Sequence, residues 1–179
     1  MTEAALTPPA RKGPGFAEFV CLVAVLMALN ALAIDSMLPA LPAIGGNLNV
    51  VDENARQWII TAYLLGFGVA QIVYGPLADR YGRKPVLLVG VGVYVVFALL
   101  AAFAPAFELL IAARVGMGLG AASTRVLAVS IVRDRYSGRT MARVMSLSFL
   151  VFLGVPILAP TVGQLIMLVA PWRWIFGFF

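Results

Sequence analysis

The sequence predicts an all-α protein, a bundle of helices that cross a lipid bilayer. Hydrophobic residues make up 62% of the 179 residues, and the mean hydropathy is +0.98. A soluble chain of this size cannot bury so much apolar surface, because ordinary domains contain only about 45–50% apolar residues. Apolar runs long enough to cross about 30 Å of hydrocarbon recur along the chain. They do not alternate as the strands of a membrane barrel would.

Five of these runs have the length of a complete membrane span, and a sixth begins near the end of the sequence. They cover about residues 16–43, 56–78, 85–103, 107–132 and 140–169, with the sixth opening at Trp172. The preceding residues 1–15 are rich in proline and glycine and are predicted to form a flexible cytoplasmic tail, which leaves 16–179 as the transmembrane bundle. A helix that ends at Phe179 is too short to cross the bilayer. We therefore expect either a fragment of a longer protein or a truncated gene.

The basic residues fall mostly on one side of the predicted membrane. Nine arginines and lysines lie on one side: before the first span, between the second and third spans, and between the fourth and fifth spans or at the start of the fifth. Only Arg56 and Arg173 lie on the other side. The positive-inside rule then predicts a cytoplasmic N-terminus and a multi-pass protein of the bacterial inner membrane, with the lipid bilayer as its partner. Topology accounts for the net charge of +5, so we expect no nucleic-acid partner.

A cleaved signal peptide is the alternative for the first apolar run. Arg11 and Lys12 precede it, and Ala31 to Ala33 resemble a cleavage site. The run is longer than the apolar region of a usual signal peptide, and four more spans follow. We expect an uncleaved first helix.

Residue usage also narrows the chemistry. The chain has no histidine and one cysteine, Cys21 in the first span, which excludes a histidine-dependent triad, an ordinary zinc site and an internal disulfide. No nucleophile motif occurs. We therefore expect no enzyme activity, no metal site and no cofactor.

Three ionisable side chains lie well inside predicted spans: Asp35 in the first, and Arg114 and Arg125 in the fourth. Each costs roughly 2.5–3.5 kcal/mol at the centre of a membrane helix, so such residues usually mark functional sites. We interpret Asp35 as a carboxylate in a central aqueous cavity that binds a proton or a cationic substrate. The two arginines are eleven residues apart and share one helix face, which we expect to point inward. The alternatives are a hydrogen bond from Asp35 to backbone opened by Pro39, and an Arg114 that extends to the membrane interface.

The fifth span contains two prolines. Pro156 and Pro160, with Gly163 close by, predict a bent or broken helix that lines a cavity. An ordinary proline kink is the alternative. In the fourth span, Gly116 and Gly120 form a small-xxx-small pair that permits close helix packing.

A dense charged turn joins the second and third spans. Residues 75–87 read Gly-Pro-Leu-Ala-Asp-Arg-Tyr-Gly-Arg-Lys-Pro-Val-Leu. This segment resembles, position for position, the first cytoplasmic loop signature of the major facilitator superfamily of transporters. Arg114 with the small residues at 118 and 120–122 is similar to the fourth-helix motif of that family, and residues 156–163 look like its antiporter motif. Segments 34–42, 131–134 and 172–176 look like the Bcr/CflA-type drug-resistance branch. Met117, Ala159, Gln164 and the position of Arg125 depart from these patterns.

The resemblance implies a drug:proton antiporter of twelve helices in two six-helix halves, each built from inverted three-helix repeats. This chain would be the N-terminal half, lacking the C-terminal six-helix half as a partner, and the proton gradient would drive efflux of small molecules. Spans one and four would both face the cavity and place Asp35 beside Arg114. An inactive or structural fragment and a porter for a sugar or metabolite remain alternatives.

Roles for individual residues follow from the same expectation. Asp35 would exchange a proton for substrate, with Arg114 modulating its proton affinity. The loop would act as a conformational latch in which Asp79 pairs with Arg133, and its basic residues would also contact anionic lipids. The expected latch residues are Gly75, Asp79, Arg80, Gly82, Arg83, Lys84 and Arg133. Weaker candidates for the substrate cavity are Asn30, Tyr63, Gln71 and Thr124.

Overall fold

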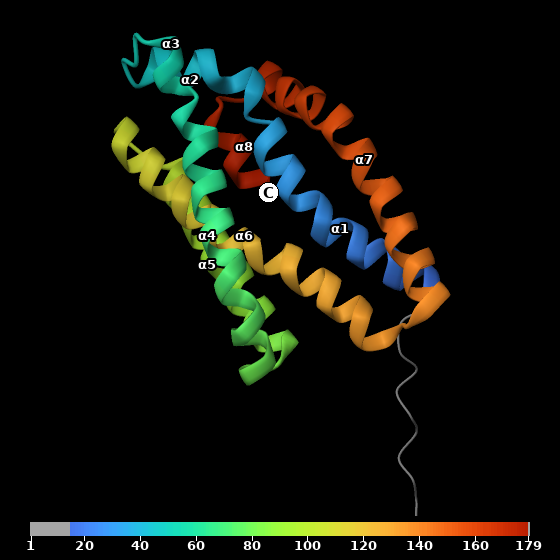
Figure 1. Cartoon of the computed structure of the whole chain (residues 1–179). Coiled ribbons are helices and arrows are strands. Elements are labelled where there is room, and N and C mark those ends of the chain that lie inside the picture. The colour runs from blue at the N-terminus through green and yellow to red at the C-terminus, as the bar shows by residue number, and fades with distance from the viewer. Residues whose placement is uncertain (1–14, 179) are drawn as a thin grey trace, which may run out of the picture.

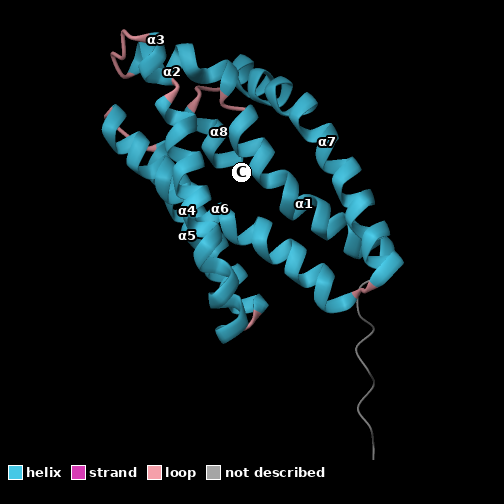
Figure 2. Cartoon of the chain, viewed as in Figure 1, coloured by secondary structure: helices cyan, strands magenta, loops and turns pink. Residues whose placement is uncertain are grey.

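The computed structural model describes residues 15–178, and every regular element in that range is a helix (Figure 1, Figure 2). The predicted tail lies outside the described residues except for Gly15. The elements in chain order are α1 (Phe16–Asp35), the short 3₁₀ helix η1 (Leu38–Ala40), α2 (Leu41–Asn47), α3 (Glu53–Arg56), α4 (Trp58–Tyr81), α5 (Arg83–Ala102), α6 (Phe107–Arg135), α7 (Gly138–Val169) and α8 (Arg173–Phe178).

The predicted membrane bundle is confirmed. Within the described part of the chain, five helical stretches are long and apolar enough to cross a membrane, and they coincide with the five predicted spans. They are Phe16–Asn47, Glu53–Tyr81, Arg83–Ala102, Phe107–Arg135 and Gly138–Val169. Most large apolar side chains of α5 and α7 are exposed, as helices bordering lipid require.

The helices form two groups that meet along α6. Helices α4 and α5 both pack on α6, while α7 packs beside α1. Figure 1 shows α1 and α7 running together on one side, with α4 and α5 on the other. The short helix α8 packs against α5 and α7.

Glycines set the close approach of α4 to α6. A methyl group on Gly66 would lie 2.1 Å from the carbonyl oxygen of Val115, and one on Gly118 would lie 2.1 Å from the carbonyl oxygen of Tyr63. Both distances are far inside van der Waals contact. The two backbones can therefore approach this closely only where side chains are absent, as small residues permit at membrane helix interfaces.

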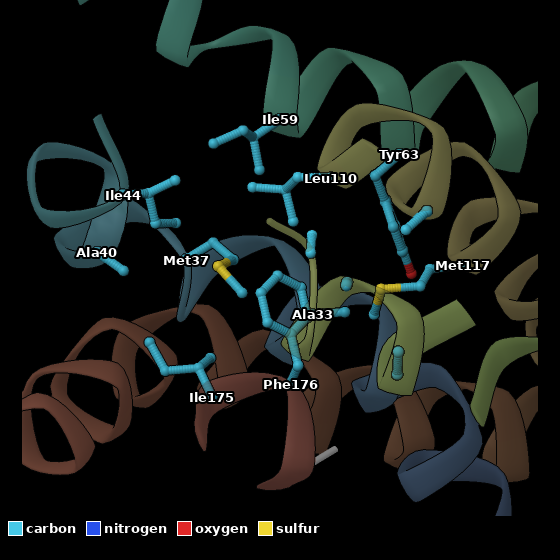
Figure 3. Close-up of a cluster of buried hydrophobic side chains, with 14 of the residues drawn as sticks. Ala33, Met37, Ala40, Ile44, Ile59, Tyr63, Leu110, Met117, Ile175 and Phe176 are labelled. Carbon is cyan, nitrogen blue, oxygen red and sulfur yellow. The ribbon is translucent and has the colours of Figure 1, made fainter. Parts of the chain in front are cut away.

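A hydrophobic cluster closes the end of the bundle where α2, α3 and α8 lie. Figure 3 shows the side chains of α1, α4, α6 and α8 pointing toward one another there. Its fully buried members include Met37, Ile44, Ile59, Leu110 and Ile175. Burying a side chain of this size contributes about 1.5–3 kcal/mol when water is the alternative. The cluster joins the C-terminal end of α1 to α2, α4, α5, α6 and α8.

The first span is interrupted directly after Asp35. The amide of Met37 donates to Ile34 O instead of continuing the α-helical pattern, which leaves the carbonyl of Ala33 without a helical donor. The hydroxyl of Ser36 donates to Leu32 O at the same turn. Pro39 and Pro42 then start η1 and α2, where a missing amide hydrogen is tolerated.

The fifth span, predicted to be bent or broken and to line a cavity, is not broken. Helix α7 continues through Pro156 and Pro160 without interruption, and Pro156 lines a cavity. Gly163 lies against the α1–η1 turn, because a methyl group there would come within 2.2 Å of Ser36 O. This glycine is therefore a packing position that brings α7 onto the interruption of the first span.

Gly66→Ala should destabilise the bundle by about 1–3 kcal/mol, because the added methyl group must push α4 from α6. Gly68→Ala is the matched control, since nothing lies within 4 Å of a methyl group at that position. Thermal unfolding of the two purified variants in detergent measures the difference. Equal melting temperatures would contradict the close approach.

Candidate functional site

A cavity of about 450 Å³ lies between the two groups of helices. Four helices contribute to its wall, and each presents at least one polar or aromatic side chain. The lining residues are Asn30, Ala31, Ile34 and Asp35 of α1, Phe67 and Gln71 of α4, Arg125 of α6, and Phe152 and Pro156 of α7. The predicted cavity candidates Asn30 and Gln71 are therefore in its wall, as is the predicted coupling residue Asp35.

Asp35 and Arg125 are the two charged residues of this cavity. Asp35 is half-buried in the last turn of α1, and Arg125 is half-buried on α6. The guanidinium of Arg125 lies 5.5 Å from the ring centroid of Phe152, a cation–π distance. Among residues 15–178 the two charges do not form an ion pair with each other.

Arg114 is not in the cavity wall, contrary to the prediction. Its side chain is fully buried on α6. The Nε atom donates to Ile59 O at 3.1 Å, and an Nη atom donates to Ala33 O at 3.1 Å. The second of these carbonyls is the one that the interruption of α1 leaves without a helical donor. Arg114 therefore joins α1 and α4 through backbone oxygens instead of pairing with Asp35.

Aromatic rings complete the surroundings of Arg114. Its guanidinium carbon lies 4.7 Å from the ring centroid of Tyr63 and 5.9 Å from that of Phe176. The remaining Nη atom has no hydrogen-bond partner within the described residues. A buried cation held by two carbonyls and two ring faces can be tolerated without a carboxylate, because each of these groups presents negative charge to it.

Tyr63 and Thr124 also differ from their predicted role. The hydroxyl of Tyr63 donates to Asn30 Oδ1 at 2.9 Å, and Asn30 Nδ2 donates to Thr124 Oγ1 at 3.4 Å. Thr124 in turn donates to Ala121 O at 2.8 Å. Tyr63 and Thr124 are buried, so this chain of hydrogen bonds links α4, α1 and α6 behind the cavity wall. Their hydroxyls hold Asn30 in place and do not line the cavity.

A second charged site joins the α4–α5 turn to the end of α6, and we call it the charged end. Arg83 contacts Asp79 at 2.7 Å and Asp134 at 2.9 Å. The predicted pairing of Asp79 with Arg133 is wrong: Asp79 contacts Arg83, and Arg133 is exposed. The reason is geometric, because residues 79 and 83 are four positions apart across the turn, a spacing that brings their side chains together.

The rest of the predicted latch is arranged around that turn. Gly82 has a φ of 89°, a backbone conformation that side chains disfavour, so glycine is needed there. The guanidinium of Arg80 lies 5.3 Å from the ring of Tyr81. Lys84 is exposed, and nothing packs within 4 Å of a methyl group on Gly75.

Sequence reasoning missed several residues of these sites. Phe67 and Phe152 line the cavity, but an aromatic residue in an apolar run carries no signal that separates it from core or lipid-facing positions. Asp134 could have been found, because a carboxylate beside Arg133 at the end of a span is unusual in so apolar a chain. Its contact with Arg83 could not have been predicted, because the two residues are 51 positions apart in the sequence.

The architecture and the charged turn define a class of membrane transporter. Residues 23–179 match the Major Facilitator Superfamily, and the chain belongs to that family. This agrees with the helical bundle, the glycine-rich α6 and the charged end.

Two relatives illustrate the similarity. The chain is 35% identical over 156 residues to multidrug resistance protein D of Escherichia coli strain K12, which covers 87% of this chain and 39% of that protein. It is 36% identical over 157 residues to multidrug resistance protein MdtL of Shigella boydii serotype 18, which covers 88% of this chain and 40% of that protein. The chain thus spans about two-fifths of the length of the curated relatives it matches.

Arg114→Lys should lower stability by about 3 kcal/mol, because an ammonium group cannot reproduce both bonds of the guanidinium fork at a buried position. Arg173→Lys is the control: Arg173 also donates to a carbonyl, Ala104 O, but is only half-buried. Denaturant titration of the two variants in detergent compares them. If both lost the same small amount, the buried contacts of Arg114 would not support the helices as described.

Proposed function

We propose that the full-length protein containing this chain exports small molecules, drugs among them, across the bacterial inner membrane in exchange for protons. The chain provides one wall of the transport path. The observation that carries the proposal is the cavity beside Asp35, an acidic side chain near the end of a membrane helix with space for a ligand next to it. The names of the relatives, which describe multidrug resistance, support the substrate class.

Asp35 has the chemistry for the coupling step. The carboxylate is within reach of a ligand, and it forms no ion pair with another described residue. In its ionised form it attracts a cation, and after protonation it does not. Proton binding and substrate binding therefore compete for the same group, which is the condition for exchange.

Arg114 acts in this scheme as a positioning residue. It holds the carbonyl of Ala33, two residues before Asp35, and so supports the interrupted end of α1. This places the carboxylate at the cavity without giving it a permanent counter-charge. A direct ion pair would instead favour the ionised carboxylate in every state of the cycle.

The charged end serves as a conformational latch on the cytoplasmic side. Arg83 bridges Asp79 and Asp134, so the α4–α5 turn is attached to the end of α6. Exposed ion pairs of this kind are individually weak, which suits a contact that must open in each transport cycle. Its cytoplasmic placement, and that of the N-terminus, rests on the asymmetry of the basic residues.

Asp35→Asn should reduce efflux driven by a pH gradient to the level of protein-free liposomes, because the amide cannot exchange a proton. Insertion and folding should be unchanged, since the amide is similar in size. Asp35→Glu, which keeps an ionisable group, is the matched control and should retain partial activity. Gradient-driven efflux at the normal rate by the asparagine variant would rule out Asp35 as the coupling residue.

Asp79→Asn should lower the turnover number about five-fold while leaving the KM nearly unchanged, because an exposed latch contact affects the conformational step more than substrate binding. Arg139→Gln is the control, as it removes an exposed charge at the start of α7, outside the latch. Initial rates of efflux over a range of substrate concentrations separate the two parameters. A change confined to the KM would contradict the latch.

A further inference from the structure

The cavity contains both a carboxylate and a guanidinium. Within residues 15–178 the side chains of Asp35 and Arg125 form no hydrogen bond or ion pair, and the guanidinium of Arg125 lies over the face of Phe152. Both charges line the same space of about 450 Å³. Each is therefore available to a ligand that supplies the opposite charge.

Their relative positions can be derived from the hydrogen bonds between α1 and α6. Asn30 on α1 donates to Thr124 on α6, which fixes the register of the two helices at that level. Arg125 follows Thr124 directly, whereas Asp35 lies five residues beyond Asn30. At 1.5 Å per residue, Asp35 stands about 7.5 Å farther along α1 than that contact. The two charged groups thus occupy different levels of the cavity.

The space between the charges is lined mainly by apolar groups. Phe67 and Phe152 face it from α4 and α7, and Ile34 and Pro156 lie beside them. Such a wall suits an aromatic or aliphatic body, because apolar surface is removed from water on binding. Gln71 adds one neutral polar side chain.

The geometry points to a zwitterionic substrate, with an apolar body between a cationic group placed at Asp35 and an anionic group placed at Arg125. This inference rests on the proposed function, since it names the substrate class of the same cavity. A ligand with only a positive charge would leave Arg125 uncompensated and would be repelled by it. A ligand with only a negative charge would meet the same difficulty at Asp35.

Three dyes of related shape and different charge test this selectivity. Rhodamine B carries a cationic ring system and a free carboxylate, its ethyl ester keeps the cation alone, and fluorescein is an anion. Fluorescence anisotropy with the purified full-length gene product in detergent gives the three dissociation constants. We expect rhodamine B to bind about ten-fold more tightly than its ester, the effect of one charge-assisted hydrogen bond.

Substitutions at the two charges show where each end of the dye binds. Arg125→Gln should weaken rhodamine B about ten-fold, to the affinity of the ester, and leave the ester unchanged or bound more tightly. Arg125→Lys keeps the charge and should restore most of the preference, which separates the effect of charge from a folding defect. Asp35→Asn should weaken both dyes. Arg139→Gln, outside the cavity, should change none of these values.

The outcomes distinguish the inference from the proposed function. If the ester binds as tightly as rhodamine B and Arg125→Gln changes neither, the zwitterion inference is wrong, and the cavity takes lone cations. If fluorescein binds best, the inference is equally wrong and the cavity prefers anions. In both cases gradient-driven efflux of the preferred dye, and its loss in Asp35→Asn, still tests the exchange of substrate for protons.

Discussion

The arrangement of the helices depends on the buried guanidinium of Arg114. It lies on α6 and donates to one backbone carbonyl of α1 and one of α4. In a bilayer an unsatisfied carbonyl has no water to accept from, so a donor at the interrupted end of α1 is required. The glycines of α4 and α6 make this reach short enough, because they allow the two backbones into contact. The interruption of α1, the glycines and Arg114 therefore depend on one another.

Because Arg114 donates to backbone carbonyls, it does not pair with the carboxylate of Asp35. Asp35 lies two residues after Ala33 and three after Leu32, whose carbonyls accept from Arg114 and from the hydroxyl of Ser36. Its carboxylate nevertheless forms no ion pair within residues 15–178. The opposite charge that shares its cavity is Arg125, at a different level of α6. Arg114 therefore supports the helices, whereas we propose that Arg125 of the same helix contacts the ligand.

The charged end differs from the interior in its energetics. Asp79 and Asp134 are exposed and Arg83 is partly exposed, so water and salt weaken their attraction, and their contacts can break and form easily. The buried contacts of Arg114 and the chain from Tyr63 through Asn30 to Thr124 are not screened in this way. The buried polar contacts are therefore stronger than the ion pairs at the surface. This is the distribution expected if one end opens and closes around a stable bundle.

The sequence by itself determined the class of the protein, its spans, the family, the glycines of the fourth span that permit close packing, and Asp35 as a cavity residue. These follow from hydropathy, residue size and the charged turn, which are properties of single segments. Only the tertiary structure decided which partner each polar group has. Arg114 and Arg125 share a helix face by spacing, but they stand about 16 Å apart along α6 and so meet different neighbours. The crossing and register of α1, α4 and α6 determine those neighbours, and the periodicity of one helix carries no information about its register with another. The same reason explains why Arg83 also meets Asp134 at the end of α6, and why Tyr63 and Thr124 lie behind the cavity wall.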